Sequence, residues 1–553
     1  MSVEKLIVDH METWTSALQT RSTAGRGSSG KIDLYGIKKL RELILELAVR
    51  GKLVPQDPND EPASDLLKRI AAEKAELVKQ GKIKKQKPLP EISEEEKPFE
   101  LPEGWEWVHL PDIYCSISES SRKIKSSEIL PEGKYPVIEQ SQEFISGYCN
   151  NECLLIKLNN PVIVFGDHTR NIKFIDFDFV VGADGVKILS PILICERFFF
   201  WQLRSFKLDV RGYARHFKVL NSCLFALPPI AEQERIVEKV SSLMSLCDQL
   251  EQQSLTSLDA HQQLVETLLG TLTDSQNTAE LAENWARISE YFDTLFTTEA
   301  SVDALKQTIL QLAVMGKLVP QDPNDEPASE LLKRIAQEKA QLVKEGKIKK
   351  QKPLPPISDE EKPFELPEGW EWCRIGNIVN IKSELVSPKD YLNLYQVAPD
   401  IIEKGTGRVI SKRTVKESGV KGPNSRFYKG QIVYSKIRPS LSKVFLAEYN
   451  GLCSADMYPL DCYINPNYLL KYILSIPFLM QVKKAENRIK MPKLNSDSFY
   501  NIIVAIPPYN EQQAIFDKIN SIEAVCNGLI SYIGIYHKTQ LHLADALTDA
   551  AIN

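Results

Sequence analysis

Two short polar segments carry the residues with the clearest chemical potential. Each follows an apolar, strand-like run, in VIVFGDHTR (162–170) and in QIVYSKIRP (431–439). The first segment offers Asp167, His168, Thr169 and Arg170, and the second offers Ser435, Lys436 and Arg438, with Ser440 and Lys443 after it. Arginine can donate two hydrogen bonds to guanine, and aspartate can accept one from cytosine. The residue types therefore favour recognition of polar edges over bond-breaking chemistry.

Basic residues gather near both segments. In the first half they are Lys123 and Lys125, followed by an acid-free cluster of Arg211, Tyr213, Arg215, His216 and Lys218. In the second half they are Lys483, Lys484, Arg488, Lys490 and Lys493. A basic run is usually a solvated face, but two runs at matching places favour contacts with phosphates, which supply affinity in nucleic-acid binding.

The sequence lacks the usual catalytic and metal-binding signatures. IPPY (506–509) is similar to the [DNS]-P-P-[YFW] motif of adenine methyltransferases, but it begins with the apolar Ile506, and the other copy reads LPPI (227–230). There is no G-x-x-x-x-G-K-[ST] motif, and the ten cysteines include no C-x-x-C pair. We expect no catalytic residue, no metal and no cofactor in this chain.

A long internal repeat frames these segments. Residues 48–107 and 313–372 differ at only seven of sixty positions, and GKLVPQDPNDEPAS occurs identically at 51–64 and 316–329. Each copy predicts a helix, a break at Gly-Lys-Leu-Val-Pro, a second helix, a basic run and a final Gly-Trp-Glu-Trp. Ser64 and Ser329 are the predicted N-caps of the second helices.

A second repeat, ALPPIAEQERI (226–236) and AIPPYNEQQAI (505–515), precedes two long heptad patterns. The first seam contains Ile236, Val240, Leu243, Cys247 and Leu250, with Leu264 and Leu268 further on. The second contains Ile515, Ile519, Ile522, Cys526 and Leu529, then Ile533, Tyr536, Leu543 and Leu547. A heptad seam needs a partner, and the other copy supplies one. Packing of each helix on its own domain is the alternative.

The predicted fold is mixed α/β, with two α/β recognition domains separated by a long antiparallel two-helix coiled coil and related by a pseudo-two-fold repeat. The predicted parts are an N-terminal extension with a flexible linker (1–31), a first frame repeat (32–107), a first recognition domain (108–228), a central frame (229–372) with a long helix (229–270) and a second repeat (305–372), a second recognition domain (373–508) and a C-terminal helix (509–553).

Charge is distributed unevenly along the chain. The net charge is −5, yet residues 373–504 carry +10 and residues 108–225 carry +1, so the remainder carries −16. The first domain compensates locally through its basic cluster. No apolar run approaches the ~18 residues of a membrane span, and the N-terminus does not look like a secretory signal. We therefore expect a cytoplasmic protein that does not contact a membrane.

Together these features resemble the specificity subunit of type I restriction-modification systems, in the branch with a long N-terminal repeat. The resemblance covers essentially the whole chain and rests on Pro-Pro-x-x-Glu-Gln at 228–233 and 507–512, the heptad helices and the duplicated frame. It implies a non-catalytic subunit that reads an asymmetric bipartite target in double-stranded DNA with a fixed spacer. It also implies two methyltransferase subunits docked on the frames and motor-nuclease subunits in the full complex, with S-adenosylmethionine, ATP and Mg in those partners.

Two other functions are compatible with parts of the sequence. A DNA adenine methyltransferase with its own recognition domains is disfavoured by the missing motifs, and a structural coiled-coil adaptor is disfavoured by the charge of 373–504. The repeated polar residues Gln56, Asp57, Asn59, Asp60 and Glu61 and the lysine run 84–87 predict one kind of partner bound twice. Recent gene conversion is the alternative explanation for this identity.

Overall fold

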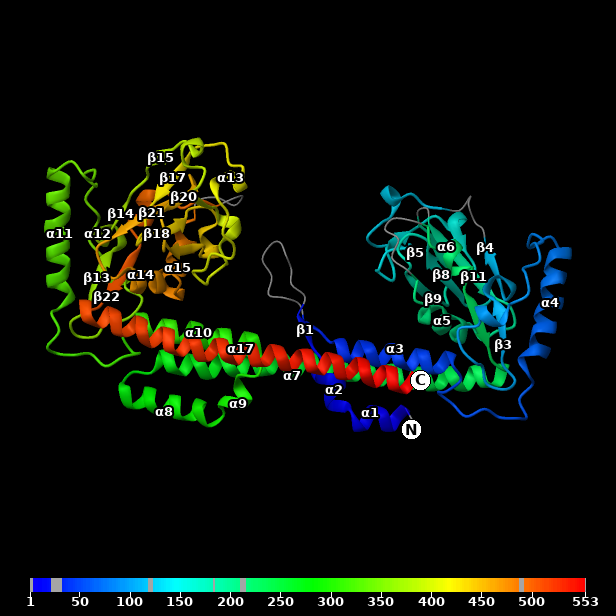
Figure 1. Ribbon diagram of the computed structural model, residues 1–553. Coiled ribbons are helices and arrows are strands. Elements are labelled where there is room, and N and C mark those ends of the chain that lie inside the picture. Colours follow the sequence, from blue (N-terminus) through cyan, green and yellow to red (C-terminus); the bar gives the residue numbers. More distant parts are fainter. Residues whose placement is uncertain are drawn as a thin grey trace. The chain divides into compact units, whose positions relative to one another are not determined.

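The computed structural model describes residues 3–20, 32–117, 123–182, 185–208, 215–486 and 492–552. The chain divides into two compact units (Figure 1). The first unit holds residues 1–257 and 535–553, and the second holds residues 258–534. Each unit therefore contains the first part of one long helix and the last part of the other, together with one mixed α/β domain.

Helices form the frame of the first unit. They are α1 (Val3–Asp9), α2 (Met11–Ser16), α3 (Tyr35–Val49), α4 (Ala63–Lys79), the beginning of α7 (Ile230–Asp274) and the end of α17 (Tyr509–Ile552), with β1 (Gln19–Thr20) antiparallel to β2 (Ile32–Asp33). Trp14 of α2 is fully buried, so the N-terminal segment contributes to the packed frame. The predicted flexible linker, residues 21–31, lies outside the described residues.

The recognition domain of the first unit has two four-stranded sheets. One has the order β4 (Tyr114–Ile117), β11 (Val186–Pro191), β8 (Val162–Gly166), β9 (Ile172–Ile175), and the other β6 (Gly147–Cys149), β5 (Tyr135–Ile138), β10 (Phe179–Val181), β7 (Leu155–Ile156). A separate pair joins β3 (Glu106–His109) to β12 (Leu224–Leu227), and the helices are α5 (Glu196–Ser205) and α6 (Phe217–Leu220).

The second unit has a similar set of elements. Its frame contains α8 (Thr278–Glu290), α9 (Phe292–Leu295), α10 (Glu299–Val314) and α11 (Ala328–Lys344). Its sheets have the orders β14 (Val379–Ile381), β21 (Met457–Cys462), β18 (Ile432–Ser435), β19 (Val444–Leu446) and β15 (Leu385–Val386), β17 (Asn424–Phe427), β20 (Gly451–Ser454), β16 (Tyr395–Val397), and β13 (Glu371–Arg374) pairs with β22 (Ile503–Ile506). The domain helices are α12 (Ile375–Ile378), α13 (Val415–Ser418), α14 (Pro466–Ile473), α15 (Ile476–Ala485) and α16 (Ser496–Tyr500).

The two recognition domains share most of their sheet topology. The sheets around β8 and β18 are antiparallel throughout, and the other two sheets each contain one parallel pair, β5 with β10 and β16 with β20. They differ at an edge, because β6 extends the β5 side of one sheet whereas β15 extends the opposite, β17 side of the other. Short 3-10 turns complete the units at Glu94–Glu96, Leu110–Asp112, Ser126–Glu128, Glu152–Leu154, Asp359–Glu361, Pro388–Tyr391, Pro399–Ile401 and Pro439–Leu441.

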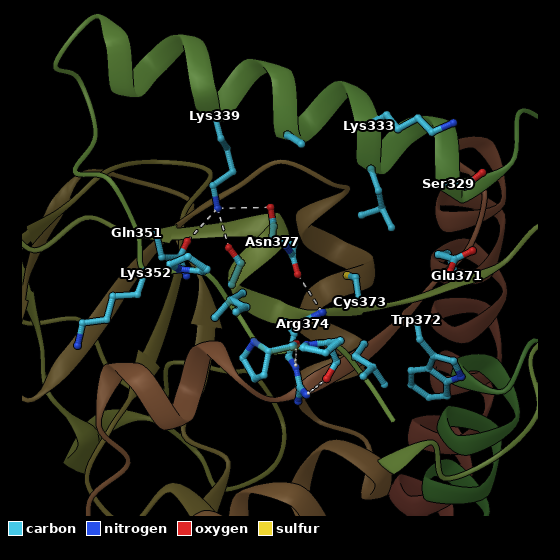
Figure 2. Close-up of a pocket in the computed structure, with 18 residues that line it drawn as sticks. Ser329, Lys333, Lys339, Gln351, Lys352, Glu371, Trp372, Cys373, Arg374 and Asn377 are labelled. Carbon is cyan, nitrogen blue, oxygen red and sulfur yellow. Dashed lines mark hydrogen bonds between the residues drawn. The ribbon is translucent and has the colours of Figure 1, made fainter. Parts of the chain in front are cut away.

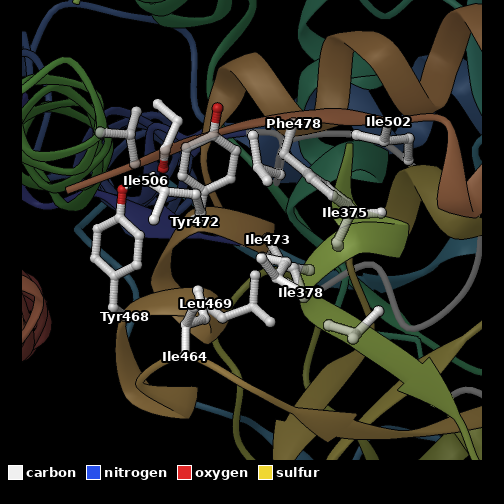
Figure 3. Close-up of a cluster of buried hydrophobic side chains, with 14 of the residues drawn as sticks. Ile375, Ile378, Ile464, Tyr468, Leu469, Tyr472, Ile473, Phe478, Ile502 and Ile506 are labelled. Atoms are coloured by element: carbon white, nitrogen blue, oxygen red, sulfur yellow. Dashed lines mark hydrogen bonds between the residues drawn. The ribbon is translucent and has the colours of Figure 1, made fainter. Parts of the chain in front are cut away.

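The largest apolar core of the second unit runs from the frame into the recognition domain. Figure 3 shows its centre, where Ile375 and Ile378 lie near Phe478 and Ile502. The same core includes Leu310 of α10 and residues of α11 and α17. Because close-packed interiors transmit position well, this core fixes the recognition domain on its frame.

The long helices pair in antiparallel order. In the second unit the end of α7, through Val265 and Leu269, shares a core with Cys526 and Ile533 of α17. In the first unit, α3 contacts the beginning of α7 through Arg41, which pairs with Asp248 at 2.7 Å. It also contacts the end of α17, where the Tyr35 hydroxyl donates to Asp545 over 2.7 Å.

The strict heptad seam is wrong toward the end of each long helix, beyond Leu250 in α7 and beyond the buried Ile533 in α17. Ile236, Val240, Leu243, Cys247, Leu250, Ile515, Ile519 and Cys526 are buried and Ile522 and Leu529 are half-buried, as a seam requires. Beyond them Leu264 is 51% exposed and Leu543 is 44% exposed, whereas the adjacent Val265 and Ala544 are buried. A straight helix has 3.6 residues per turn and drifts ~20° per heptad, so the buried stripe moves by one residue.

Two further expectations differ from the structure. Ser64 and Ser329 are not N-caps, because α4 and α11 already begin at Ala63 and Ala328 after a proline. The long helix predicted at 229–270 continues to Asp274, and the helices α8 and α9 were not predicted from the sequence.

Candidate nucleic-acid interface and its supporting frame

The loop after β8 is held mainly by its first residue. Asp167 is only 4% exposed, and its carboxylate accepts a 2.8 Å hydrogen bond from the Phe217 backbone N–H. The Asp167 carbonyl accepts from the backbone N–H of His216, whose side chain is also buried. The side chains of Asp167 and His216 are thus part of the interior of the domain and are not exposed to a ligand. The DNA contacts expected of these two residues are not supported by this placement.

Arg170 ends this loop in an unusual backbone conformation. Its φ is 62°, in the left-handed region that a non-glycine residue adopts at a cost of about 1–2 kcal/mol. Its guanidinium NH1 donates to the Leu208 carbonyl at 2.8 Å. The Thr169 hydroxyl donates to the Gln140 carbonyl, and the His168 backbone N–H donates to the Gln140 side chain. The loop is therefore ordered rather than loosely attached.

The loop after β18 has the same strained character. Arg438 has a φ of 45° and Ser442 has a φ of 46°. The Arg438 side chain is exposed and has no ion-pair partner among the described residues, so its guanidinium is available to a ligand. Ser435 is fully buried and donates to the Ile437 carbonyl, which makes it structural. A strained backbone conformation persists only where the surrounding structure enforces it, and residues with such conformations cluster at functional sites.

The two loops occupy equivalent backbone positions. The N–H of Asp167 donates to Gly185 over 2.7 Å, and the N–H of Lys436 donates to Asp456 over 3.1 Å. The carbonyl of each residue then accepts from the next segment, from His216 at 2.8 Å and from Leu494 at 2.9 Å. One scaffold thus holds an acidic residue in the first domain and a basic residue in the second.

The other predicted basic residues fall into three groups. Lys125, Arg215, Lys218, Lys483 and Lys484 are exposed, and Lys123 is half-buried. The second group has partners inside the protein. Lys436 donates to the Ala455 carbonyl, Lys443 donates to the Pro399 carbonyl, and Lys493 pairs with Asp456. The backbone N–H of Ser440, which was also predicted to contact DNA, donates to Glu486. Arg211, Tyr213, Arg488 and Lys490 lie outside the described residues.

The joint between each frame and its recognition domain was not predicted from the sequence. Glu232 is 1% exposed and accepts from Trp105 Nε1 at 2.9 Å and from Gln56 Nε2 at 3.1 Å. The following Gln233 accepts from the backbone N–H of Cys195, the residue before α5. Burial raises the pKa of Glu232, and its two side-chain donors oppose that shift.

The second unit repeats this joint with its own residues. Glu511 accepts from Trp370 at 2.9 Å and from Gln321 at 3.1 Å, and Gln512 accepts from the backbone N–H of Asn465 at 2.9 Å. Glu-Gln of the Pro-Pro-x-x-Glu-Gln motif is therefore a structural clamp. The signal in the sequence was the co-occurrence of identical polar residues beside identical tryptophans in both copies.

The repeated polar residues also make contacts within the protein. Gln56 donates inside the joint, to the Gly51 carbonyl as well as to Glu232. Asp57 accepts from Asn59 in a local turn, and Asp60 pairs with Arg235 at 2.6 Å. Gln56, Asp57, Asn59, Glu61 and the lysine run 84–87 are nevertheless exposed, so a partner bound twice stays a prediction.

A second helix–domain contact lies beside a cavity of about 740 Å³ in the second unit (Figure 2). Lys339 of α11 donates from Nζ to the Gly376 carbonyl at 2.6 Å and to the Val379 carbonyl at 3.0 Å. Burial lowers the pKa of Lys339 to about 8. Arg374 fastens the proline-rich segment through the Pro355 and Pro356 carbonyls and through Glu361.

Both Pro-Pro turns are buried structural turns, and the carbonyls of Pro228 and Pro229 accept hydrogen bonds from Gln233. Ile506, Pro507 and Pro508 are buried between β22 and α17, and the carbonyls of both prolines are used by Gln512. Over the described part of the chain, no group of three or more His, Cys, Asp or Glu residues could hold a metal ion. No described helix is long and apolar enough to cross a membrane.

The family model described as the type I restriction modification DNA specificity domain matches residues 102–260 and again residues 367–533. The chain belongs to this family. Each match begins just before the Gly-Trp-Glu-Trp segment and covers one recognition domain and the following long helix as far as residue 260 or 533. The two specificity domains therefore coincide with the two structural copies described above.

Relatives within the family are similar over their full length. The chain is 51% identical to the type I restriction enzyme EcoAI specificity subunit and 49% identical to the EcoEI specificity subunit, both of Escherichia coli, with 100% of each chain covered. A solved HsdS subunit from Thermoanaerobacter tengcongensis is 16% identical over 83% of this chain and 98% of that one, with a TM-score of 0.37. Membership of the specificity family rests on the domain matches and the two sequence relatives.

Proposed function

We propose that this chain is the non-catalytic subunit that gives DNA-sequence specificity to a type I restriction-modification complex. The observation that carries the proposal is the pair of strained loops after β8 and β18, which share a scaffold but differ in side chains. Double-stranded DNA presents a different donor and acceptor pattern for each base pair in its major groove. Two equivalent loops with different side chains suit a target with two unlike halves.

In this proposal each recognition domain reads one half of an asymmetric bipartite target, and the paired long helices set the spacer. The exposed residues Arg438, Lys125, Arg215, Lys218, Lys483 and Lys484 are the strongest candidates for DNA contacts. Arg170 is a further candidate because of its strained backbone. The role places the chain in the cytoplasm, with the DNA.

The proposed partners follow from the duplicated frames. Two methyltransferase subunits dock on them, one per unit, and motor-nuclease subunits complete the restriction complex. S-adenosylmethionine, ATP and Mg then act in the partners rather than in this chain. The names of the EcoAI and EcoEI relatives, which are specificity subunits of type I restriction enzymes, support this assignment.

Mapping of methylated sites tests the function. The chain is combined with the methyltransferase subunit of its own system, and modified positions are sequenced in random DNA. We expect one bipartite motif with a fixed spacer, and Arg438→Ala should relax only one of its halves. Methylation by this chain alone would contradict the non-catalytic role, and unselective methylation by the wild-type complex would contradict the specificity role.

A further inference from the structure

We propose that two basic arms of the frame, residues 63–90 with α4 and residues 328–355 with α11, bind the phosphate backbone of DNA that flanks the recognised sequence. The proposal rests on the proposed DNA-reading function and adds a second, sequence-independent contact to it. Neither arm belongs to the strand-end loops already described.

Charge sets the arms apart from the rest of the chain. Each arm holds eight lysines or arginines and three acidic residues, a net charge of +5, although the whole chain has a net charge of −5. The arms differ at four positions, and two of these differences compensate, because Glu76 corresponds to Gln341 while Gln80 corresponds to Glu345. The two arms thus keep the same net charge despite the substitutions.

The positive charge at the tip of each arm, residues 79–90 and 344–355, is only partly neutralised internally, by the pairs Lys79–Glu76, Lys347–Glu345 and Lys352–Asp497. In the first tip Lys82, Lys84, Lys85 and Lys87 are exposed, and none has an acidic partner among the described residues. In the second tip Lys349 and Lys350 are likewise exposed and unpaired over the described part of the chain. Clustered like charges repel one another, so an anionic ligand would relieve a cost that the free protein carries.

Each arm is nevertheless held in a fixed position. α4 buries only Ala63, Leu66 and Ile70 of its seventeen residues, but the half-buried Lys74 donates from Nζ to the Pro111 carbonyl at the start of the recognition domain. Lys339 makes the equivalent contact in the second unit. In Figure 1 each helix rises along the side of its own recognition domain, with its basic end far from the long helices. Seventeen helical residues span about 26 Å.

The composition of the tips favours DNA over a protein partner. Protein interfaces are depleted of lysine and rely on buried aromatic or arginine anchors, whereas lysines neutralise phosphates in DNA complexes. The exposed tips are lysine-rich and contain no aromatic residue. The phosphate backbone is the same on both sides of any target, which suits two nearly identical arms beside two unlike recognition domains.

The test uses the full chain assembled with its methyltransferase subunits. Lys84, Lys85 and Lys87 are changed to Gln in one variant, and Lys349, Lys350 and Lys352 in another. Binding is measured against salt on targets with long flanks and on targets trimmed to the recognised sequence. We expect each variant to lose the affinity gained from long flanks and to reduce the slope of log K against log salt by about 0.9 for each phosphate that is no longer neutralised.

Footprinting adds directional information. Each variant should lose backbone protection on one flank only, on the side of its own recognition domain, and keep its sequence preference. A matched control changes the exposed Lys38, Lys518 and Lys538 to Gln and removes the same charge from α3 and α17. That control should retain the flank effect.

Three results separate the possibilities. Unchanged flank dependence and an unchanged salt slope in both arm variants would overturn the proposal. Loss of methyltransferase assembly with normal DNA contacts would also overturn it and identify the arms as protein-docking surfaces. A wild-type complex without any sequence preference would instead refute the underlying specificity function. In that case the arms are still tested, because the effect of flank length on binding can be compared between the wild-type complex and the arm variants.

Discussion

Trp370 Nε1 donates a 2.9 Å hydrogen bond to Glu511, a carboxylate that is only 4% exposed. Trp105 makes the same bond to Glu232 in the other unit, also at 2.9 Å. Burial raises the pKa of each carboxyl group, whereas the hydrogen bonds from tryptophan and glutamine lower it. These donors therefore stabilise the charged carboxylate in its buried position. The pair joins the end of a frame repeat to the beginning of a long helix.

Removal of this acceptor should destabilise the second unit. Glu511→Ala leaves the buried indole N–H of Trp370 without its acceptor, and an unsatisfied buried group costs about 1–3 kcal/mol. Gln321 loses one acceptor but still donates to the Gly316 carbonyl. Glu511→Gln should cost less because it keeps one oxygen. Urea unfolding measures the difference, and Glu368→Ala, at an exposed site, is the control. Equal losses at Glu511 and Glu368 would refute the structural role of the joint.

The contact between α11 and the recognition domain should strengthen at alkaline pH. Burial lowers the pKa of Lys339 to about 8 from 10.5. Between pH 8 and 10.5, Lys339 is neutral in the folded protein but still protonated when α11 is detached. The free energy needed to detach α11 therefore rises with pH across this window and is lowest below pH 8. Hydrogen exchange of α11 measures it. Lys339→Met should abolish the pH dependence, and persistence of the rise in that variant would assign it to another group.

The displaced seam predicts unequal costs for two similar substitutions in α7. Leu269→Ala should destabilise the second unit by about 2–5 kcal/mol because Leu269 is 3% exposed in the helical core. Leu264→Ala should change stability by no more than about 0.5 kcal/mol because its side chain is 51% exposed. Both are measured by urea unfolding. A larger loss at Leu264 would restore the strict heptad arrangement.

The strained arginine after β18 predicts a conflict between stability and function. Arg438→Gly should leave the unfolding free energy unchanged or raise it by at most about 1 kcal/mol, since glycine adopts positive φ without steric cost. The same change should weaken binding to target DNA. Arg438→Lys, which keeps the charge and the strain, is the matched comparison. Full binding by the glycine variant would exclude a role for this side chain in DNA contact.

The sequence predicted the repeated organisation because its signals are local and duplicated. Apolar periodicity located the long helices, and the buried runs at 162–166 and 432–435 became β8 and β18. The seam failed beyond Leu250 in α7 and beyond Ile533 in α17 because apolar residues next to the predicted positions, Val265 and Ala544, are buried instead. Burial of Val265 rather than Leu264 depends on the tertiary partner and could not be inferred from the sequence pattern.

The candidate site was less predictable. Arg438 is exposed and Asp167 is buried in the structure. In the sequence, however, both residues follow an apolar strand-like run, so the pattern gives no reason to expect this difference. The fate of Asp167 is decided by a hydrogen bond from Phe217, fifty residues away. The clamp residue Glu232 likewise depends on Trp105, which is distant in sequence. Hydrogen bonds between buried polar groups that are distant in sequence decide which side chains stay exposed, and such bonds cannot be read from the sequence pattern.

The paired strands at the entrance of each recognition domain have a consequence for its evolution. β3 pairs with β12 and β13 pairs with β22, four residues each, so the chain enters and leaves each domain at neighbouring points. Between them lie residues 110–223 in one unit and 375–502 in the other, segments of 114 and 128 residues. The tryptophan–glutamate bond is 2.9 Å in both. Each domain is thus an insertion between two neighbouring points of its frame. Its length can change without moving those points, whereas the residues that it contributes to the shared core and to the glutamine contact must be kept.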